Sequence, residues 1–474
     1  MSVKKNLVLN FINQLMTMLM PLVLTPYLTR ILGAEQLGVY SFEYNRAYYF
    51  TLFVLLGLNN YGNRAIAKVR DNPEQRSKTF LSIYALQLMS GILCLGIFLA
   101  EAVLRHQNFE LRIAMAFLVL SSIFDVNWFF SGMELFYITI TRNIVLKTAT
   151  IIAVLALVKD SSDTVIYAVI ISVGALINTL YIWVITGRYV GWTAITRKEV
   201  VKHIKPNLVL FLPVIAISIY NIMDKLLLGW MSDYSQVGFY DASEKIMFIP
   251  KSMITALGIV MLPRISGLIS SPGNEKKIKD YIDRSVIFSL FFSSLAAFGI
   301  MGVAKEFVPM YYGSGFESCI ILYKILLPGT VFEAVASVIR TQYLIPYGFD
   351  KKYVASVFAG AIVNLLIDIL LISKYGAAGA AVGTFFAEFA VFLVQYIAVR
   401  RELNLRRAFL QSAVMVINAI IMYAILECLP LKAENIFAGF MIKLLVGFLV
   451  YAALTAPYYF LHLKKFLDID RKPR

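Results

Sequence analysis

The most chemically distinctive residues of this chain are basic side chains that lie inside long apolar stretches. On insertion scales, one Arg or Lys at the centre of a membrane helix costs about 2.5–3.5 kcal/mol, and such side chains usually face a water-filled cavity. Arginine binds phosphate through two parallel hydrogen bonds, and lysine adds a compact positive charge. We therefore predict that an anionic substrate is bound by Arg30, Arg46, Lys225, Lys245 and Arg340.

Polar and acidic residues accompany these cations at helical spacing. Asn207, Ser218, Asn221 and Lys225 fall on one stripe of a helix, which makes Asn221 a further candidate for substrate contact. Acidic residues in the same apolar runs are candidates for coupling transport to protons or sodium, and the sequence does not rank them. These candidates are Asp224, Asp241, Glu244 and Glu333.

Opposite charges at short spacing also have a purely structural interpretation. Glu43 and Arg46 are three residues apart and share one face of a helix, and Asp224 adjoins Lys225. Such pairs can hold helices together without touching a substrate. Three other lysines lie nearer the ends of apolar runs, where we expect the ammonium group to snorkel to the membrane surface: Lys251, Lys324 and Lys443.

These residues are positioned by a chain with the composition of a membrane protein. Of its 474 residues, 59% are hydrophobic and 15% are charged, whereas soluble domains carry about 25% charged residues. A membrane helix needs about 20 mostly apolar residues, and the sequence contains fourteen such runs. We therefore predict an all-α polytopic membrane protein with fourteen transmembrane helices, at approximately 7–29, 38–61, 79–103, 112–131, 142–158, 164–186, 206–231, 237–262, 285–304, 319–342, 353–373, 377–399, 408–429 and 436–461.

The basic residues predict which loops face the cytoplasm. Lys and Arg collect in alternate loops, among them Arg142, whereas few basic residues, such as Arg112, fall in the opposite loops. By the positive-inside rule, the Lys-rich and Arg-rich side is cytoplasmic, and both termini lie there. The net charge of +15 follows from this topology, so we expect no nucleic-acid partner.

An internal repeat indicates how the helices are organised. Asn6–Leu9 returns as Asn207–Leu210, and the sequence from Gln36 to Tyr40 returns as Gln236–Tyr240. Two related halves suit a transporter that works by alternating access around a shared site. We predict six-helix bundles at 1–186 and 206–400, a basic cytoplasmic linker at 187–205 with a short surface helix near Thr196–Lys205, and two extra helices with a basic tail at 401–474.

Several function classes are disfavoured by the composition. The three cysteines and three histidines are scattered along the chain, so we predict neither a disulfide framework nor a metal site. The predicted loops are too short to house a soluble catalytic domain. We therefore expect a transporter, not an enzyme, with no cofactor beyond a coupling proton or sodium ion.

Several motifs along the chain form a pattern that is typical of one known family. The run Asp125–Glu134 has the sequence DVNWFFSGME, and the other stretches are Gly238–Tyr240 with Glu244 and Lys245, Leu262–Arg264, Gln342–Pro346, Lys351–Tyr353, Asn364 and Tyr375–Ala381. Together they resemble the bacterial polysaccharide repeat-unit flippases (Wzx-like) of the multidrug/oligosaccharidyl-lipid/polysaccharide exporter superfamily, in which the first run is similar to the signature of the fourth helix. The resemblance spans nearly the whole chain.

This resemblance implies a fold of two six-helix bundles plus two extra helices, around a central basic cavity. The implied substrate is an undecaprenyl-diphosphate-linked oligosaccharide, flipped from the inner to the outer leaflet of the bacterial cytoplasmic membrane, and polysaccharide polymerase and chain-length proteins are implied as partners. The functional positions carried over are Arg30, Asp224, Lys225, Glu244, Lys245 and Gln342. Arg46, Glu333 and Arg340 depend on helical phase alone.

Other functions remain open at this stage. A lipid II flippase fits the same architecture. A cation-coupled multidrug exporter typically has twelve helices and an acidic cavity, which suits this mixed, basic set less well. An oligosaccharide polymerase or ligase uses related substrates but usually carries a large external catalytic loop, which the predicted topology does not contain.

Overall fold

The computed structural model describes residues 3–271, 273–429 and 435–460, and for residues 3–19, 136 and 220 it describes the backbone alone. Every regular element in these ranges is a helix. Within them, twelve helical segments are long and apolar enough to cross a membrane, and they coincide with the third to the fourteenth predicted spans. The first predicted span and most of the second fall in one element, α1 (Val3–Leu55), and the second span ends in the next helix, α2 (Leu58–Ala67). An all-helical, multi-pass membrane protein is thus confirmed, and the number fourteen stays a prediction.

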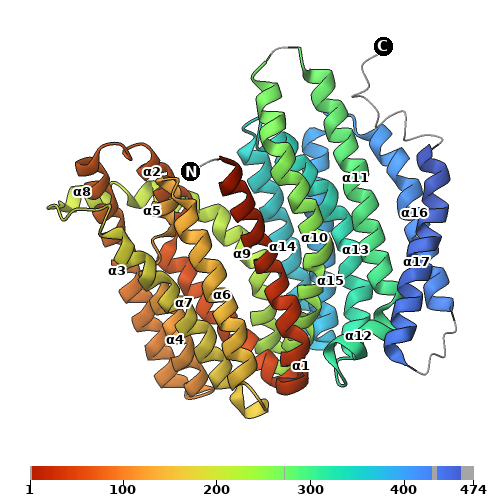
Figure 1. Ribbon diagram of the computed structural model, residues 1–474, viewed down its shortest axis with the longest axis horizontal. Coiled ribbons are helices and arrows are strands. Elements are labelled where there is room, and N and C mark those ends of the chain that lie inside the picture. The colour runs from red at the N-terminus through yellow and green to blue at the C-terminus, as the bar shows by residue number, and fades with distance from the viewer. Residues whose placement is uncertain (1–2, 272, 430–434, 461–474) are drawn as a thin grey trace. The chain divides into compact units, whose positions relative to one another are not determined.

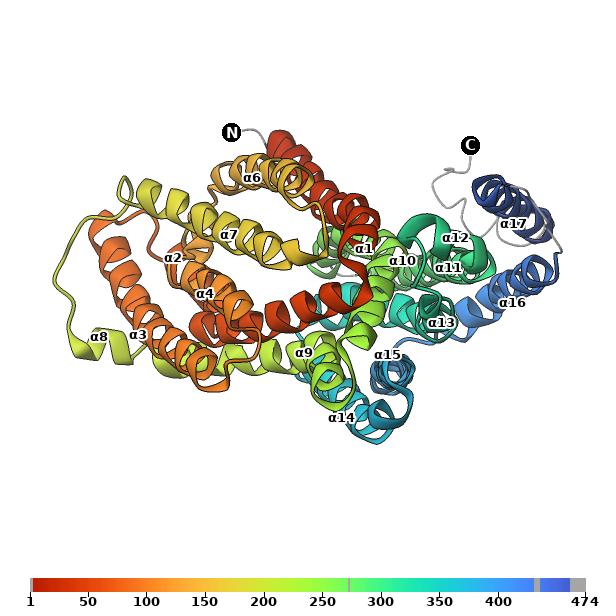
Figure 2. The same cartoon turned by 90° about the horizontal axis from the view of Figure 1, so that it is seen from below.

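The contacts between residues divide the chain into two units, and the boundary in the sequence lies between Gly238 and Phe239. The first unit contains α1, α2 (Leu58–Ala67), α3 (Pro73–Arg105), α4 (Phe109–Ile123), α5 (Asn127–Gly132), α6 (Phe136–Leu157), η1 (Ser161–Asp163), α7 (Thr164–Thr186), α8 (Arg197–Val201) and α9 (Ile204–Met231). In this unit α4 packs against α1, α3 and α7 (Figures 1 and 2). Leu111, Met115 and Val119 of α4 are almost fully buried in the apolar core there.

The second unit holds the remaining helices, and α10 (Tyr234–Ile269) begins at the end of the first unit and continues into the second. The others are α11 (Glu275–Gly302), α12 (Ala304–Tyr312), α13 (Ser318–Ile339), η2 (Arg340–Leu344), α14 (Asp350–Tyr375), α15 (Ala377–Val399), α16 (Arg406–Cys428) and α17 (Ile436–Tyr458). α11 and α13 pack against each other, α15 packs on α13 and α14, and α16 packs on α11 and α17. The predicted six-helix bundles at 1–186 and 206–400 were inferred from the internal repeat, and their boundaries stay a prediction.

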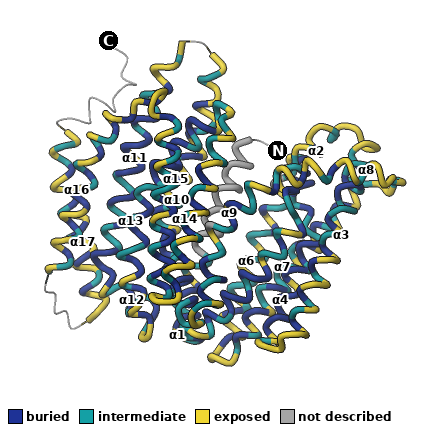
Figure 3. The backbone as a smooth tube through the Cα atoms, turned by 180° about the vertical axis from the view of Figure 1, so that it is seen from behind, coloured by how far each residue is buried: buried dark blue, intermediate teal, exposed yellow. Residues whose placement is uncertain are grey.

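The burial pattern of both units is that of helices in a membrane. Along each long helix, buried residues alternate with exposed ones (Figure 3). Many of the exposed residues are large and apolar, such as Leu93 on α3, Leu370 on α14 and Leu445 on α17. Surface of this kind is stable in contact with lipid and would be costly in water.

Local sequence explains where several helices begin and bend. Before α3, the Asn72 side chain accepts a hydrogen bond from the Gln75 amide at 3.0 Å, and Pro73 occupies the first helical turn. α1 is broken at Gly33, whose φ of 72° and ψ of 177° lie in a region that only glycine adopts readily. The break separates the first predicted span from the second.

Two glycines that the repeat places at equivalent positions oppose each other within the first unit. A Cβ atom added at Gly38 would collide with the carbonyl oxygen of Tyr234, and one added at Gly238 would collide with that of Ala34. The absence of a side chain therefore lets α1 and the first turns of α10 approach closely. The Asn6–Leu9 copy lies where only the backbone is described.

The short helix predicted in the linker is present as α8. Thr196 and Glu199 form a reciprocal capping box at its start. Glu199 also lies 2.6 Å from the Lys78 ammonium at the beginning of α3. These contacts attach the linker to the first unit.

The loop assignment of two arginines is wrong. Arg142, predicted in a cytoplasmic loop, is buried within α6, and Arg112, predicted in an outer loop, is buried in the first turn of α4. Both helices begin a few residues earlier than the apolar runs indicate, because a paired guanidinium is tolerated inside a helix end.

Candidate functional site

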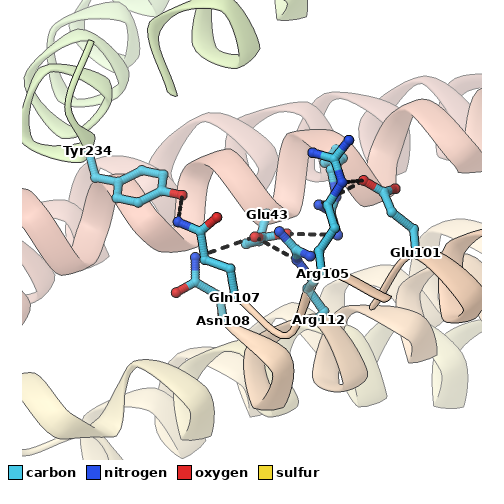
Figure 4. Close-up of polar contacts among 8 residues, drawn as sticks. Glu43, Glu101, Arg105, Gln107, Asn108, Arg112 and Tyr234 are labelled. Carbon is cyan, nitrogen blue, oxygen red and sulfur yellow. Dashed lines mark hydrogen bonds and ion pairs between the residues drawn. The ribbon is translucent and has the colours of Figure 1, made fainter. Parts of the chain in front are cut away.

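Charged side chains, three of them buried, gather at one place in the first unit, which we call the Glu43 cluster. Its members are Glu43 and Arg46 on α1, Glu101 and Arg105 on α3, Asn108 before α4 and Arg112 on α4. Figure 4 shows that Glu43 faces the start of α4, while Glu101 and Arg105 lie on the neighbouring helix. Three helices therefore bring their charged side chains to one point.

In the Glu43 cluster, two arginines share the carboxylate of Glu43. Glu43 lies 3.1 Å from Arg112 Nε and 3.2 Å from an Arg46 terminal nitrogen. A second carboxylate, Glu101, lies 3.4 Å from Arg46 and 3.6 Å from Arg105. Glu43, Arg46 and Arg112 are all at most 6% exposed, and the Arg46 guanidinium also lies over the Phe98 ring.

The Glu43 cluster carries more positive than negative charge. It contains three arginines and two glutamates. Within the described residues, Arg46 Nε and one terminal nitrogen of Arg112 are buried without a hydrogen bond or a described ion pair. Donors of this kind suit a phosphate oxygen or an ordered water.

The sequence predicted only part of this cluster. The Glu43–Arg46 pair, expected from its spacing, is confirmed. Glu101, Arg105 and Arg112 were not predicted as members. Their signal is weak, because Glu101 and Arg105 lie at the end of an apolar run and Arg112 was assigned to a loop.

The other predicted residues of the first unit lie apart from the Glu43 cluster in sequence. Arg30 is exposed on α1 and donates to the Pro26 carbonyl oxygen at 2.9 Å. On α9, Asp224 and Lys225 are buried and Asn221 is exposed. A buried lysine in the middle of an apolar helix fits the predicted role of Lys225, and that role stays a prediction.

In the second unit, the structure brings two of the predicted α10 residues together. Lys245 Nζ lies 2.7 Å from Asp241, one helical turn away, and Glu244 is half-buried beside them. Arg340 at the start of η2 donates a hydrogen bond from a terminal nitrogen to the Ser337 hydroxyl oxygen of α13 at 3.1 Å. The Arg340 guanidinium also lies 5.9 Å from the ring centre of Tyr353. These contacts hold each cation in place within its own helix or beside the next.

Gln342 is the most deeply buried of the predicted binding residues. It lies in the π-helix η2, is 0% exposed, and neither amide atom has a hydrogen bond within the described residues. π-helical turns inside α-helices occur frequently at functional sites. The predicted contact of Gln342 with the substrate stays a prediction.

Glu333 pairs with a partner that the sequence did not assign to it. The Lys251 ammonium lies 3.0 Å from Glu333 and 3.0 Å from Glu388, and we call these residues the Lys251 triad. The expectation that Lys251 snorkels is wrong for this reason. Lys443 does not snorkel either, since it is buried and lies 2.7 Å from Glu306, and Lys324 lies 3.0 Å from Glu427.

The Asp125–Glu134 signature forms a structural network. Gln87 on α3 donates to the carbonyl oxygens of Ser122 and Asp125 at 2.8 and 2.9 Å and accepts from Trp128 Nε1 at 3.0 Å. Arg142 on α6 donates to the Asn127 side chain at 3.2 Å. Gln87 therefore satisfies the backbone between α4 and α5, and the signature residues Trp128 and Asn127 connect this segment to α3 and α6.

The last residue of the signature lies outside the membrane spans. Glu134 adopts a left-handed φ of 58° and lies 2.6 Å from the Arg70 guanidinium. The hydrogen bond that Arg70 donates to this carboxylate raises the pKa of Arg70 above its usual value.

Metal ligands do not cluster in the part of the chain that the structure describes. Among those residues, no group of three or more His, Cys, Asp and Glu side chains is placed to hold a metal ion. The polar groups of the described helices form ion pairs and hydrogen bonds inside apolar sequence.

Comparison with known proteins places this arrangement in context. A family profile described as "Polysaccharide biosynthesis protein" matches residues 3–269. A putative O-antigen transporter of Shigella dysenteriae is 25% identical over 407 residues, which cover 84% of this chain and 100% of that protein. A putative O-antigen transporter of Escherichia coli (strain K12) is 23% identical over 390 residues, covering 81% and 93%.

A solved structure shares the fold. The lipid II flippase MurJ in its inward closed conformation superimposes with a TM-score of 0.75 over 96% of this chain and 98% of that one. The identity is 15%, so this likeness shows the fold alone.

Proposed function

We propose, from the premise that this chain belongs to the polysaccharide biosynthesis protein family, that it is a flippase for lipid-linked oligosaccharides. Two putative O-antigen transporters align with more than four-fifths of it, which supports a repeat-unit flippase over the other members of the superfamily. The substrate is an undecaprenyl-diphosphate-linked oligosaccharide. It moves from the inner to the outer leaflet of the bacterial cytoplasmic membrane by alternating access.

The observation that carries this proposal is the burial of cationic side chains inside apolar helices. Within the described residues, Arg46 Nε and one terminal nitrogen of Arg112 are buried without a hydrogen bond, and Lys225 is buried in α9. A diphosphate is the part of the substrate that lipid repels most strongly, and arginine recognises it by charge and geometry. Asn, Ser and Thr side chains, such as Asn221, would form hydrogen bonds with the sugars.

The topology that this function requires is also part of the proposal. Fourteen helices with both termini in the cytoplasm place the basic loops on the side where the substrate is made. A polymerase and chain-length proteins on the outer side would consume the flipped product. Asp224, Asp241, Glu244 and Glu333 remain the candidates for ion coupling.

A lipid II flippase is the second candidate function. Its support is the shared fold, which many transporters with other substrates could share. The relatives that cover most of this chain are O-antigen transporters. The repeat-unit substrate is therefore the better supported of the two.

The test is accumulation of lipid-linked sugar in cells depleted of the protein. We expect a complete repeat unit to build up on the cytoplasmic leaflet, where an impermeant label cannot reach it. Wild-type protein should relieve this accumulation, Lys225→Ala should relieve it at least about tenfold less well, and Lys159→Ala, an exposed lysine, should act as the wild type. Normal export of the repeat unit, together with a new sensitivity to cationic drugs, would instead indicate a drug exporter.

A further inference from the structure

The linker at 187–205 is held against the first turns of α3. Arg76 on α3 donates two hydrogen bonds to the Tyr189 carbonyl oxygen, at 3.1 and 2.8 Å. The Gly191 amide donates a third hydrogen bond to the Ser77 hydroxyl oxygen at 3.0 Å. Figure 2 shows the linker running from the end of α7 to α8, which lies beside α3. A segment attached at several points presents a defined surface to its surroundings.

Exposed cations dominate this surface. The linker has one acidic residue, Glu199, and its carboxylate lies 2.6 Å from Lys78. Glu74 on α3 lines the same shallow hollow as Arg188, so the four cations that follow carry the excess positive charge. All the Lys and Arg residues of the linker are exposed, and the structure shows no ion pair for any of them within the described residues: Arg188, Arg197, Lys198, Lys202 and Lys205.

An apolar groove lies beside these cations. It has a volume of about 330 Å³ and is lined by α3, the end of α7 and the linker. The rings of Tyr84 and Trp183, whose centres are 4.3 Å apart, belong to its wall, and Trp192 of the linker lines it as well. Ile195, also in the lining, precedes Arg197 by two residues. The groove and the cations are therefore neighbours.

The groove continues into the surface that faces lipid. Leu88, in its lining, is 37% exposed, and Tyr181 and Val184 on either side of Trp183 are also exposed. Trp192 is 92% exposed. An indole ring is favoured at the headgroup level of a bilayer, where both its apolar body and its N–H group find partners. The position of Trp192 marks this end of the first unit as a membrane interface.

The combination of cations and apolar groove favours one class of ligand, an anionic phospholipid. Its phosphate attracts Lys and Arg, and basic pockets between membrane helices on the cytoplasmic side, where we predict the linker, bind acidic lipid head groups. Its acyl chain is stabilised in an apolar groove that is open to the bilayer. A soluble anion would use the cations alone and leave the groove without an occupant.

We propose that the linker and the groove beside it form a binding site for an anionic phospholipid. The phosphate group contacts the cations from Arg197 to Lys205, and one acyl chain enters the groove beside Trp192. A zwitterionic lipid binds less tightly, because its head group has no net charge to attract the cations. This site does not require that the protein be a flippase.

The test uses the fluorescence of Trp192. The purified full-length protein is reconstituted in phosphatidylcholine bilayers that contain increasing fractions of brominated phosphatidylglycerol and no polyprenyl lipid. Bromine quenches tryptophan at contact, and the difference between the wild type and Trp192→Phe isolates the signal of this residue. We expect phosphatidylglycerol to bind at least about tenfold more tightly than brominated phosphatidylcholine, because each cation near the bilayer surface contributes to the attraction. High salt should weaken this preference.

Two double variants separate the linker from the charge of the whole protein. Arg197→Ala combined with Lys198→Ala should lower the preference at least about fivefold. Lys276→Ala combined with Lys277→Ala is the matched control, since it removes the same charge from exposed positions at the start of α11, and it should keep the preference. Equal quenching by the two lipids in the wild type, or an equal loss of preference in both double variants, would overturn the proposal.

A third comparison tests the groove. Ala85→Leu adds bulk to the lining of the groove, whereas Ala100→Leu adds the same bulk at an exposed position of the same helix. In protein that elutes as a single folded species, Ala85→Leu should weaken quenching by phosphatidylglycerol at least about threefold relative to Ala100→Leu. Equal quenching in these two variants would show that no acyl chain occupies the groove.

Discussion

At the scale of single residues, Glu43 holds together the largest group of buried charges in the first unit. It neutralises Arg46 from its own helix and Arg112 from α4. Removing one partner of a buried ion pair leaves an uncompensated charge, which costs much more than the pair itself contributes. The carboxylate is therefore more important for folding than either of its ion pairs taken alone.

This argument predicts the effect of Glu43→Gln. The variant keeps the shape of the side chain but leaves two buried guanidinium groups without their shared carboxylate, and we expect it to lose about 3–5 kcal/mol of stability. The thermal midpoint of the purified protein, followed by the loss of its monodisperse peak, measures this change. Glu35→Gln is the control, because Glu35 is exposed on the same helix and should change stability by less than about 0.5 kcal/mol. Equal midpoints for the two variants would contradict the role assigned to Glu43.

Residue spacing explains which charge pairs could be predicted. Glu43 and Arg46 are neighbours on one helix, so their contact follows from helical geometry. Arg112 is 69 residues from Glu43, and Glu101 is 55 residues from Arg46. Contacts of that separation depend on how helices pack, and one sequence does not determine this packing. The same limit applies to Lys251, whose partners lie on α13 and α15.

At the scale of elements, hydropathy predicted the spans well and their ends poorly. α10 runs to Ile269, beyond the predicted end near residue 262, and α11 begins at Glu275, ahead of the predicted 285. Polar residues continue these helices outside the apolar run, where water accepts their side chains. The π-helix η2 is not predicted by hydropathy, because hydropathy does not distinguish a π-helical turn from an α-helical one.

The break in α1 predicts the effect of a glycine substitution. Gly33 has a backbone conformation that costs other residues about 1–3 kcal/mol, although nothing lies within 4 Å of an added Cβ. Gly33→Ala should therefore lower the thermal midpoint through backbone strain alone. Gly96→Ala, at an uncrowded and exposed site inside α3, should be neutral or stabilising, since alanine favours helix. A midpoint for Gly33→Ala at or above the wild-type value would show that α1 does not need this break.

At the scale of the whole molecule, the family was predictable because it depends on the order of the motifs and on the composition of the chain. The resemblance to repeat-unit flippases is confirmed by the family match and by the two O-antigen transporters. The central cavity and the roles of Arg30, Lys225, Lys245, Arg340 and Gln342 stay predictions. Which side chains contact a substrate depends on how the helices pack, and residue spacing within one helix does not determine that packing.

The charge of the proposed substrate leads to a prediction about the energy source. A diphosphate with two negative charges gains about 4–5 kcal/mol when it leaves the negative side of a membrane at about 100 mV. This energy corresponds to a shift on the order of a thousandfold in its distribution between the leaflets. Proteoliposomes with a potassium diffusion potential and equal pH on both sides, loaded with a fluorescent diphosphate-linked sugar lipid and an impermeant quencher outside, measure that distribution. The matching monophosphate lipid, with about half the charge, should show about half the free-energy change per millivolt. A distribution that does not respond to voltage for either lipid would mean that the protein neutralises the headgroup completely during transport, for example by moving compensating charge with it.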